Sequence, residues 1–372
     1  MVETLVPASI PPAAPSTAIR LEQVQFLRFL AAASVLLGHA MMEGKHSDLL
    51  PSLFDPIYNF PWGAGVDVFF VISGFIMFFV SADKTPGVNT ARTFIAKRIR
   101  RVVPLYWFFT LLMLIAILLF PDRVSESDTG WGEMVSSLLF VPYLPNDDGL
   151  FRPVLAQGWT LNYEMYFYAC FAVTVLLTIR WRFISIALIM LTIVALSAIS
   201  NGSVGALTFY GNTVVIEFLL GGAIFFVMKK GGRVNSAVCL AGIALAVAML
   251  CLAPETPNQT RVIYWGLPAF ILSSSVILCA GRIRAVFSLP IFQVLGDASY
   301  ALYLSHPFAY NFLLLALVHV PGPLAKTIYV PVALLVCLAA AVFVNRLIER
   351  PLDRFIGTLM PAPNAPARGV AQ

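Results

Sequence analysis

Charged residues are scarce in this sequence. Asp, Glu, Lys and Arg make up only 12% of its 372 residues, whereas 59% are hydrophobic. Soluble domains contain roughly a quarter charged and roughly half apolar residues. A water-soluble chain of this length could not bury so much apolar surface, because much of any folded chain stays in contact with water. The composition therefore excludes an ordinary soluble protein and indicates an integral membrane protein.

Several motifs of common enzyme classes are also missing. The sequence has no GxxxxGK[ST] loop, no HExxH and no GxSxG, which argues against a nucleotide motor, a zinc protease and a serine hydrolase. The five cysteines lie in or beside apolar blocks without paired metal-ligand spacing, so we expect them to pack as small apolar residues and we expect no metal site. The first 18 residues carry no positive charge, and we expect no cleaved signal peptide.

Long apolar blocks recur between charged segments. Many of them approach or reach the roughly 20 residues that cross a bilayer. They predict an all-α, polytopic fold with one transmembrane domain at residues 21–355 and disordered, Pro/Ala-rich tails at 1–20 and 356–372. About ten transmembrane helices are predicted, at residues 21–42, 63–80, 102–120, 156–179, 183–200, 207–228, 234–253, 262–280, 290–318 and 328–348.

Positive charge is unevenly distributed over the predicted loops. With a cytoplasmic N-terminus, eighteen of the 24 Lys and Arg lie on the cytoplasmic side, five lie outside, and Arg28 lies within the first helix. The positive-inside rule therefore places both termini in the cytoplasm. Anionic lipid head groups account for the net charge of +5, so we expect no nucleic-acid partner. In the long outer loop, the apolar stretch Met134–Tyr143 is too short to span and predicts a re-entrant or interfacial element.

Ionisable side chains inside the predicted helices are costly, by about 2.5–3.5 kcal/mol each, and usually functional. They are Arg28, His39, Asp67, Glu164, Glu217, Asp297 and His306. Arg28 and His39 are eleven residues apart, so they share one helix face at a separation of about 16 Å. This stripe would carry a fixed cation toward the cytoplasm and a titratable base toward the outside. Alternatively, Arg28 extends to the cytoplasmic interface and His39 caps the outer end.

Two further helices carry candidate partners of His39. Glu164 lies about two turns into its helix, at a depth comparable with His39, where it could orient the imidazole or hold an acceptor hydroxyl. Alternatively, Glu164 is a structural partner of Arg28 or of a tyrosine. His306 precedes Pro307, which would free a backbone carbonyl and favours a cavity. A hydrogen bond that only joins helices is the open alternative for His306.

The run from Arg92 to Pro104 is the densest positive patch of the chain. Guanidinium groups pair with phosphate in a bidentate manner, so the run could bind an anionic phosphate carrier. Alternatively, it anchors the topology on anionic lipid. The clustered arginines immediately before Pro104 favour phosphate.

Polar elements are dispersed along the chain in a definite order. They are Arg28 with His39, the stretch from Gly65 through Asp67 and Ser73 to Phe75, Arg98 and Arg101 before Pro104, Trp159 to Tyr168, Ser299 to Pro307, and Glu349-Arg350-Pro351. In type and in order, these elements resemble those of the acyltransferase-3 family over about residues 20–355. The resemblance implies a multi-pass bacterial inner-membrane O-acyltransferase. Such a protein moves an acyl group, commonly acetyl, from cytoplasmic acyl-coenzyme A to a hydroxyl of an extracytoplasmic or lipid-linked glycan. The stand-alone form is similar to exopolysaccharide and Nod-factor acetyltransferases.

Carried over by position, the resemblance implies His39 as the catalytic residue and Arg28 as its functional partner. Arg98 and Arg101 are then contacts of acetyl-coenzyme A or another acyl-coenzyme A, as a donor substrate and not as a permanently bound cofactor. His39 would act as a general base, with Arg28 stabilising developing charge, or would form an acyl-histidine intermediate. The remaining candidates are Glu164 as a further catalytic residue and Asp67, Ser73, Tyr300, Tyr303 and His306 elsewhere in the site.

Two other functions stay open at the level of sequence. A secondary transporter of an organic acid or a glycan would also place Arg, His, Asp and Glu inside the bundle. A purely structural partner in polysaccharide export is the third alternative. Turnover of the donor thioester distinguishes an acyltransferase, which releases free coenzyme A, from a transporter, which does not. The expected partners are acyl-coenzyme A, a glycan or lipid-linked oligosaccharide acceptor, the lipid bilayer and polysaccharide-assembly proteins.

Overall fold

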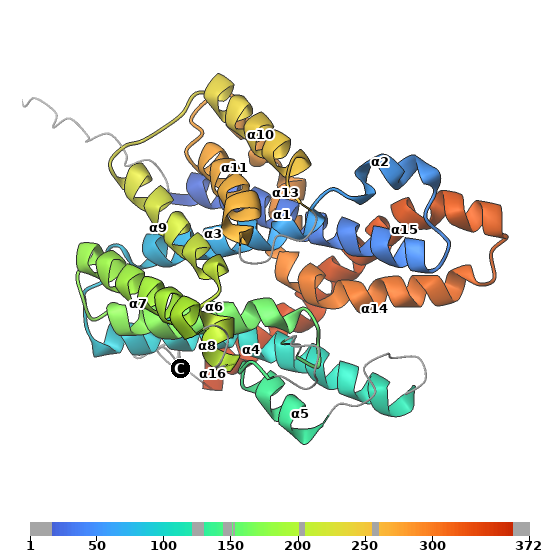
Figure 1. Ribbon diagram of the computed structural model, residues 1–372, viewed down its shortest axis with the longest axis horizontal. Coiled ribbons are helices and arrows are strands. Elements are labelled where there is room, and N and C mark those ends of the chain that lie inside the picture. The colour runs from blue at the N-terminus through green and yellow to red at the C-terminus, as the bar shows by residue number, and fades with distance from the viewer. Residues whose placement is uncertain are drawn as a thin grey trace, which may run out of the picture.

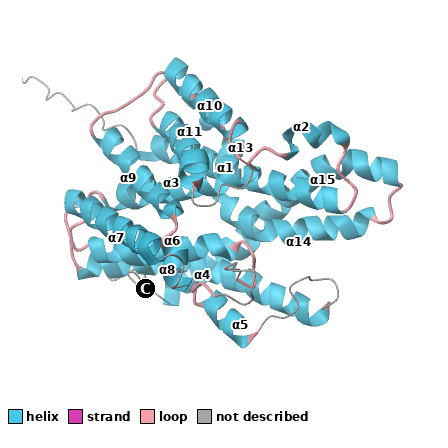
Figure 2. Cartoon of the chain, viewed as in Figure 1, coloured by secondary structure: helices cyan, strands magenta, loops and turns pink. Residues whose placement is uncertain are grey.

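The protein is helical wherever the structure describes it. The computed structural model describes residues 17–120, 130–143, 151, 153–200, 205–254 and 260–359, which contain helices, turns and a single isolated β-bridge between Val234 and Cys279 (Figure 2). Five helical stretches are long and apolar enough to cross a membrane, namely Glu22–His46, Trp62–Ser81, Val88–Leu119, Ile179–Ser200 and Gly322–Leu359. The all-α prediction is confirmed, whereas the ten crossings and the side of the termini stay predictions.

Helices occur at all ten predicted positions (Figure 1). The main ones are α1 (Thr17–His46), α3 (Gly65–Ser81), α4 (Val88–Leu119), α6 (Gly158–Thr174), α7 (Ile179–Ser200), α9 (Ile216–Lys229), α10 (Ser236–Cys251), α11 (Leu267–Ile277), α14 (Ser299–Leu317) and α15 (Gly322–Val344). The shorter ones are α2 (Asp55–Tyr58), α5 (Trp131–Leu138), α8 (Gly205–Tyr210), α12 (Arg284–Phe287), α13 (Pro290–Asp297) and α16 (Arg350–Leu359). Helix α5 lies in the loop for which a re-entrant or interfacial element was predicted.

Several predicted boundaries are wrong. The single helix expected at 290–318 is two helices, because α13 ends at Asp297 and α14 begins at Ser299. Helix α1 begins at Thr17, and α15 continues through a π-helical turn into α16, which ends at Leu359. The rest of the two predicted tails, residues 1–16 and 360–372, lies outside the described residues.

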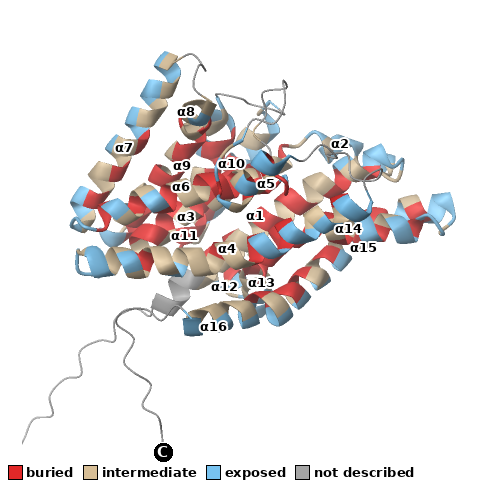
Figure 3. Ribbon diagram, turned by 90° about the horizontal axis from the view of Figure 1, so that it is seen from below, coloured by how far each residue is buried: buried red, intermediate tan, exposed pale blue. Residues whose placement is uncertain are grey.

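The centre of the bundle is the crossing of α3 and α9. A Cβ added to Gly74 of α3 would overlap the backbone of Phe218, and one added to Gly221 of α9 would overlap the backbone of Val71. Glycine at both positions lets the two backbones approach closely, as small residues do in membrane helix pairs. Helix α3 also packs against α1 and α11, and buried residues are concentrated along these helices (Figure 3).

The short helices separate into two groups. In Figure 3, α12, α13 and α16 lie along one edge of the molecule, whereas α2, α5 and α8 lie toward the opposite side. Helix α1 contacts α12 and α13, and α16 contacts α4. Segments with predicted cytoplasmic charge, distant in sequence, therefore meet at one end of the bundle. Arginines of α4 and α16 line one cavity there.

Candidate active site

The C-terminal half of α1 brings His39 against a second histidine. His39 Nδ1 lies 2.8 Å from Nε2 of His306 on α14, and the two rings are within 10° of parallel. His39 is partly exposed, whereas His306 is only 1% exposed. The structure thus places two of the predicted site residues in direct contact, although they are separated by most of the chain.

The ring of His306 is hydrogen-bonded to the backbone of its own helix. Its Nδ1 lies 3.1 Å from the carbonyl oxygen of Leu302, one turn earlier. Pro307 has no N–H group and so cannot bond to the carbonyl of Tyr303, yet α14 continues to Leu317. The rings of Tyr303 and Tyr310 flank His306, with centroids 6.3 and 6.1 Å from its ring. The histidine pair is therefore bordered by aromatic side chains on the α14 side.

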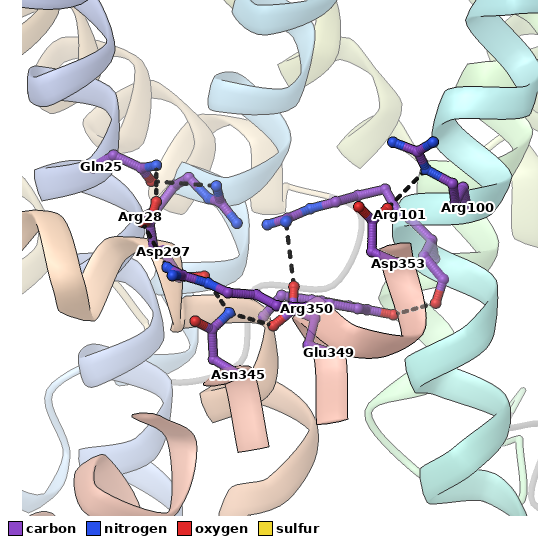
Figure 4. Close-up of polar contacts among 11 residues, drawn as sticks. Gln25, Arg28, Arg100, Arg101, Asp297, Asn345, Glu349, Arg350 and Asp353 are labelled. Atoms are coloured by element: carbon purple, nitrogen blue, oxygen red, sulfur yellow. Dashed lines mark hydrogen bonds and ion pairs between the residues drawn. The ribbon is translucent and has the colours of Figure 1, made fainter. Parts of the chain in front are cut away.

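The N-terminal half of α1 borders a cavity of about 120 Å³. Arg28 from α1 and Arg98 and Arg101 from α4 line it. Its other polar lining residues are Ser73, Thr160, Glu164, Tyr168, Tyr300 and Tyr303. Figure 4 shows the side chains of Arg28 and Arg101 extending toward each other from the two helices. Three guanidinium groups and one carboxylate, that of Glu164, line this small cavity, so its lining carries a net positive charge.

The three arginines are incompletely neutralised. Arg28 donates to Gln25 Oε1 at 3.2 Å, and the Arg98 guanidinium lies over the rings of Phe94 and Tyr168, 5.8 and 5.9 Å from their centroids. Among the described residues, of these three only Arg101 has a carboxylate within ion-pair distance. This deficit of negative charge is what a bound phosphate would correct.

Glu164 belongs to this cavity and not to the histidine pair. It accepts hydrogen bonds from Ser73 Oγ at 3.0 Å and from the hydroxyl of Tyr168. The predicted contact between Glu164 and His39 is therefore wrong, because α6 packs on α3 and α4 and His39 pairs with His306. The alternative prediction, a tyrosine partner for Glu164, is confirmed.

Two tyrosines of α14 connect the cavity with the histidines. Tyr300 donates to the carbonyl of Val102 at 2.8 Å, and Tyr303 donates to the carbonyl of Gln157 at 3.1 Å. Both tyrosines line the arginine cavity, and His306 follows one turn later on the same helix. The cationic cavity and the histidine pair are thus consecutive parts of one α14 surface.

A second cavity, of about 230 Å³, adjoins the first at Arg101, which lines both. Ion pairs cross it, and Figure 4 shows them together. They are Arg101–Glu349 at 3.2 Å, Arg100–Asp353 at 2.8 Å and Arg350–Asp297 at 3.1 Å. Glu349 is one of the residues that carry the family resemblance, but its contact with Arg101 was not predicted. No local sequence pattern indicates that α4 lies beside the end of α15.

A family comparison agrees with this arrangement. Residues 21–344 match the Acyl_transf_3 family, described as an acyltransferase domain. The chain belongs to the acyltransferase-3 family. The match covers most of the sequence, including both histidines and the three cavity arginines, and it confirms the predicted family. Together with the apolar helices, it indicates a membrane location.

Named relatives of this acyltransferase-3 protein include the exopolysaccharide production protein ExoZ of Rhizobium meliloti (strain 1021). It is 36% identical over 255 residues, which cover 66% of this chain and 76% of ExoZ. "Putative O-acetyltransferase SACOL0978" of Staphylococcus aureus (strain COL) is 26% identical over 330 residues, 78% of this chain. The chain spans about half, 52%, of that relative's length. No solved structure matches the chain.

Asp67 lies apart from both cavities of this family member. Its side chain is 0% exposed and pairs with Arg261, whose Nε and Nη2 approach the two carboxylate oxygens at 3.0 and 2.7 Å. Glu217, also 0% exposed, is a neighbour of this pair. Arg261 is one of the five Lys and Arg residues predicted to lie outside, and its pairing with a buried acid was not predicted. Among the described residues, no group of three His, Cys, Asp or Glu could hold a metal ion.

Proposed function

We propose that this protein transfers an acetyl group from acetyl-coenzyme A to a hydroxyl of an extracytoplasmic glycan or of its lipid-linked precursor. It would do so as a multi-pass protein of the bacterial inner membrane with both termini in the cytoplasm. Family membership supports acyl transfer. The relatives named for exopolysaccharide production and for O-acetyl transfer support the acyl group and the class of acceptor.

The observation that carries the proposal is that one helix, α14, carries both the tyrosines that line the cationic cavity and the histidine that pairs with His39. Arg28, Arg98 and Arg101 would hold the phosphates of the donor, since guanidinium groups match phosphate oxygens in charge and geometry. The pantetheine arm would pass Tyr300 and Tyr303 toward the histidines. Its thioester carbonyl would then lie beside His39, and the acceptor would enter from the outer side.

His39 is the residue suited to the chemical step, because its ring is partly exposed whereas His306 is buried. The acceptor oxygen attacks the thioester carbonyl carbon while His39 takes the hydroxyl proton. The carbon–sulfur bond then breaks, and the proton passes from His39 to the thiolate sulfur. Coenzyme A leaves as the free thiol and the glycan leaves as the ester. A positioned general base contributes typically about 10²–10⁴-fold to such a reaction.

Purified protein in lipid nanodiscs tests the proposal directly. Acetyl-coenzyme A with a radiolabelled acetyl group is supplied together with lipid-linked polysaccharide precursors extracted from the host. We expect free thiol and labelled glycan to appear in equal amounts. His39→Ala should lower both rates by about 10²–10⁴-fold. His46→Ala is the matched control, because His46 is exposed at the end of the same helix and should leave both rates unchanged.

The same comparison applies in cells. A strain without this protein is complemented with wild type, His39→Ala or His46→Ala, and membrane levels are equalised by immunoblot. Wild type and His46→Ala should restore O-acetyl groups on the surface polysaccharide, and His39→Ala should not. Equal restoration by His39→Ala would remove the residue from the reaction. Transport of a glycan or organic acid into vesicles without thiol release would support a transporter and overturn the proposal.

A further inference from the structure

The hydrogen bonds around His306 determine which of its ring nitrogens carries the proton. A backbone carbonyl can only accept a hydrogen bond. Nδ1 of His306 lies 3.1 Å from the carbonyl oxygen of Leu302, so Nδ1 carries the hydrogen. A charged imidazolium in a position 1% exposed would be costly, and so the ring is neutral. Nε2 of His306 therefore has a free lone pair and can only accept.

The protonation of His306 determines which nitrogen of His39 is protonated, because the two rings are in direct contact. Because His306 Nε2 accepts, His39 Nδ1, at 2.8 Å, must donate. We infer that His306 is a positioning residue that fixes His39 in the Nδ1–H tautomer, so that Nε2 of His39 is the nitrogen that meets substrate. The inference rests on the proposed function for its catalytic meaning. It excludes Nδ1 as the reacting nitrogen in both the general-base and the acyl-histidine mechanisms.

The surroundings suit this role. The rings are within 10° of parallel, and His39 Nδ1 faces a nitrogen of a ring that is itself anchored to Leu302. The carbonyl of His306 accepts from Cys337 Sγ of α15 at 3.8 Å, which adds a weak contact from a third helix. In many enzymes a carboxylate or a backbone carbonyl fixes the tautomer of a catalytic histidine. Here a neutral histidine takes that place.

The pairing also acts during the reaction. When His39 Nε2 takes the proton of the acceptor hydroxyl, the ring becomes an imidazolium that still donates from Nδ1 to His306. A hydrogen bond from a charged donor is stronger than one from a neutral donor. The contact therefore stabilises the charged intermediate more than the resting enzyme, until Nε2 returns the proton to the departing sulfur. His306 contributes without touching the substrate.

Nitrogen NMR of histidine-labelled protein in nanodiscs tests the inference independently of activity. Signals are assigned with single variants of the four histidines. In wild type we expect His39 to be protonated at Nδ1 and unprotonated at Nε2. His306→Leu should abolish this preference and lower kcat by about a hundredfold or more, since a misoriented base loses its contribution. His306→Gln can place Oε1 near the former Nε2, so it should retain the tautomer and keep kcat within about tenfold of wild type.

Two results would overturn the inference. One is wild-type His39 protonated at Nε2, and the other is a His306→Leu variant with an unchanged tautomer and kcat. Loss of kcat in both His306 variants, with the His39 tautomer retained in both, would show that His306 serves packing and would also contradict the inference. Absence of acetyl transfer in wild type, with the expected change of tautomer in His306→Leu, would refute the proposed function and leave the histidine pairing supported.

Discussion

Two groups of ion pairs in this protein use the same residue types in opposite settings. At the second cavity, the side chains of Arg100 and Asp353 are 33% and 43% exposed. In the other group, those of Arg261 and Asp67 are 18% and 0% exposed, and two hydrogen bonds join them. The first group lies beside the proposed donor site, whereas the second joins α3 to the helical turn that precedes α11.

The difference in exposure separates replaceable contacts from permanent ones. An exposed pair is worth about 0–1 kcal/mol, so water can substitute for either partner, and an anionic ligand for the carboxylate, at little cost. Removing one partner of a buried pair costs about 3–5 kcal/mol, because the other charge stays buried without compensation. The arginines beside the donor site can therefore exchange partners, and the Asp67–Arg261 pair cannot.

The largest effect is expected for Asp67→Ala. It leaves the Arg261 guanidinium without its bidentate partner, and we expect a loss of about 3–5 kcal/mol in the free energy of unfolding. Reversible unfolding in mixed micelles measures it. Asp353→Ala is the control, with an expected loss of at most about 1 kcal/mol. Similar losses for both variants would contradict the division into permanent and replaceable pairs.

An intermediate effect is expected for Arg98→Ala. Hydrogen bonds to charged groups are worth about 1.5–3 kcal/mol, so the KM for acetyl-coenzyme A should rise by about 10–150-fold. The midpoint of unfolding should stay close to that of wild type, because Arg98 forms no ion pair with any of the described residues. Arg92→Ala, an exposed arginine of the same helix, is the matched control. An unchanged KM in Arg98→Ala would exclude this arginine from donor binding.

The smallest effect is expected for Glu349→Gln. Glu349 pairs with Arg101 at 3.2 Å and therefore competes with a donor phosphate for the same guanidinium. Arg101 is 40% exposed and Glu349 only 7% exposed, so the pair is partly solvated. Removing the charge of Glu349 should tighten the binding of coenzyme A by at least about 2–5-fold, the range that a fully solvated pair would give. Isothermal titration measures the affinity. Asp353→Asn should change the affinity less, because Arg100 does not line the cavity formed by Arg28, Arg98 and Arg101. Weaker binding in Glu349→Gln would show that Glu349 supports the donor site.

The sequence predicted best what depends on a single helix. The spacing of Arg28 and His39 follows from the rise and turn of an α-helix alone, and the two residues border the two parts of the site accordingly. The family could also be predicted, because several polar elements occur in a fixed order along the chain.

Contacts between helices were not predictable in the same way. Glu164 was expected at the level of His39, but depth along a helix does not determine which neighbour it faces, and its partners are Ser73 and Tyr168. Arg261 was assigned to a loop because it stands outside an apolar block, yet it pairs with a buried acid. The break after Asp297 was missed because Asp297 was interpreted as an ionisable residue inside one helix, whereas α13 ends there.

The positions of Arg28 and His39 on α1 fix a distance as well as a pair of chemical groups. Eleven residues of helix hold His39 about 16 Å beyond Arg28 along the axis, and one additional residue between them would also turn the histidine away by about 100°. In the proposed function, the donor would therefore bridge a fixed interval between its anionic end and its reactive carbonyl. The spacing on α1 would thus select the length of the donor's carrier group, and only the space beside His39 would limit the size of the acyl group.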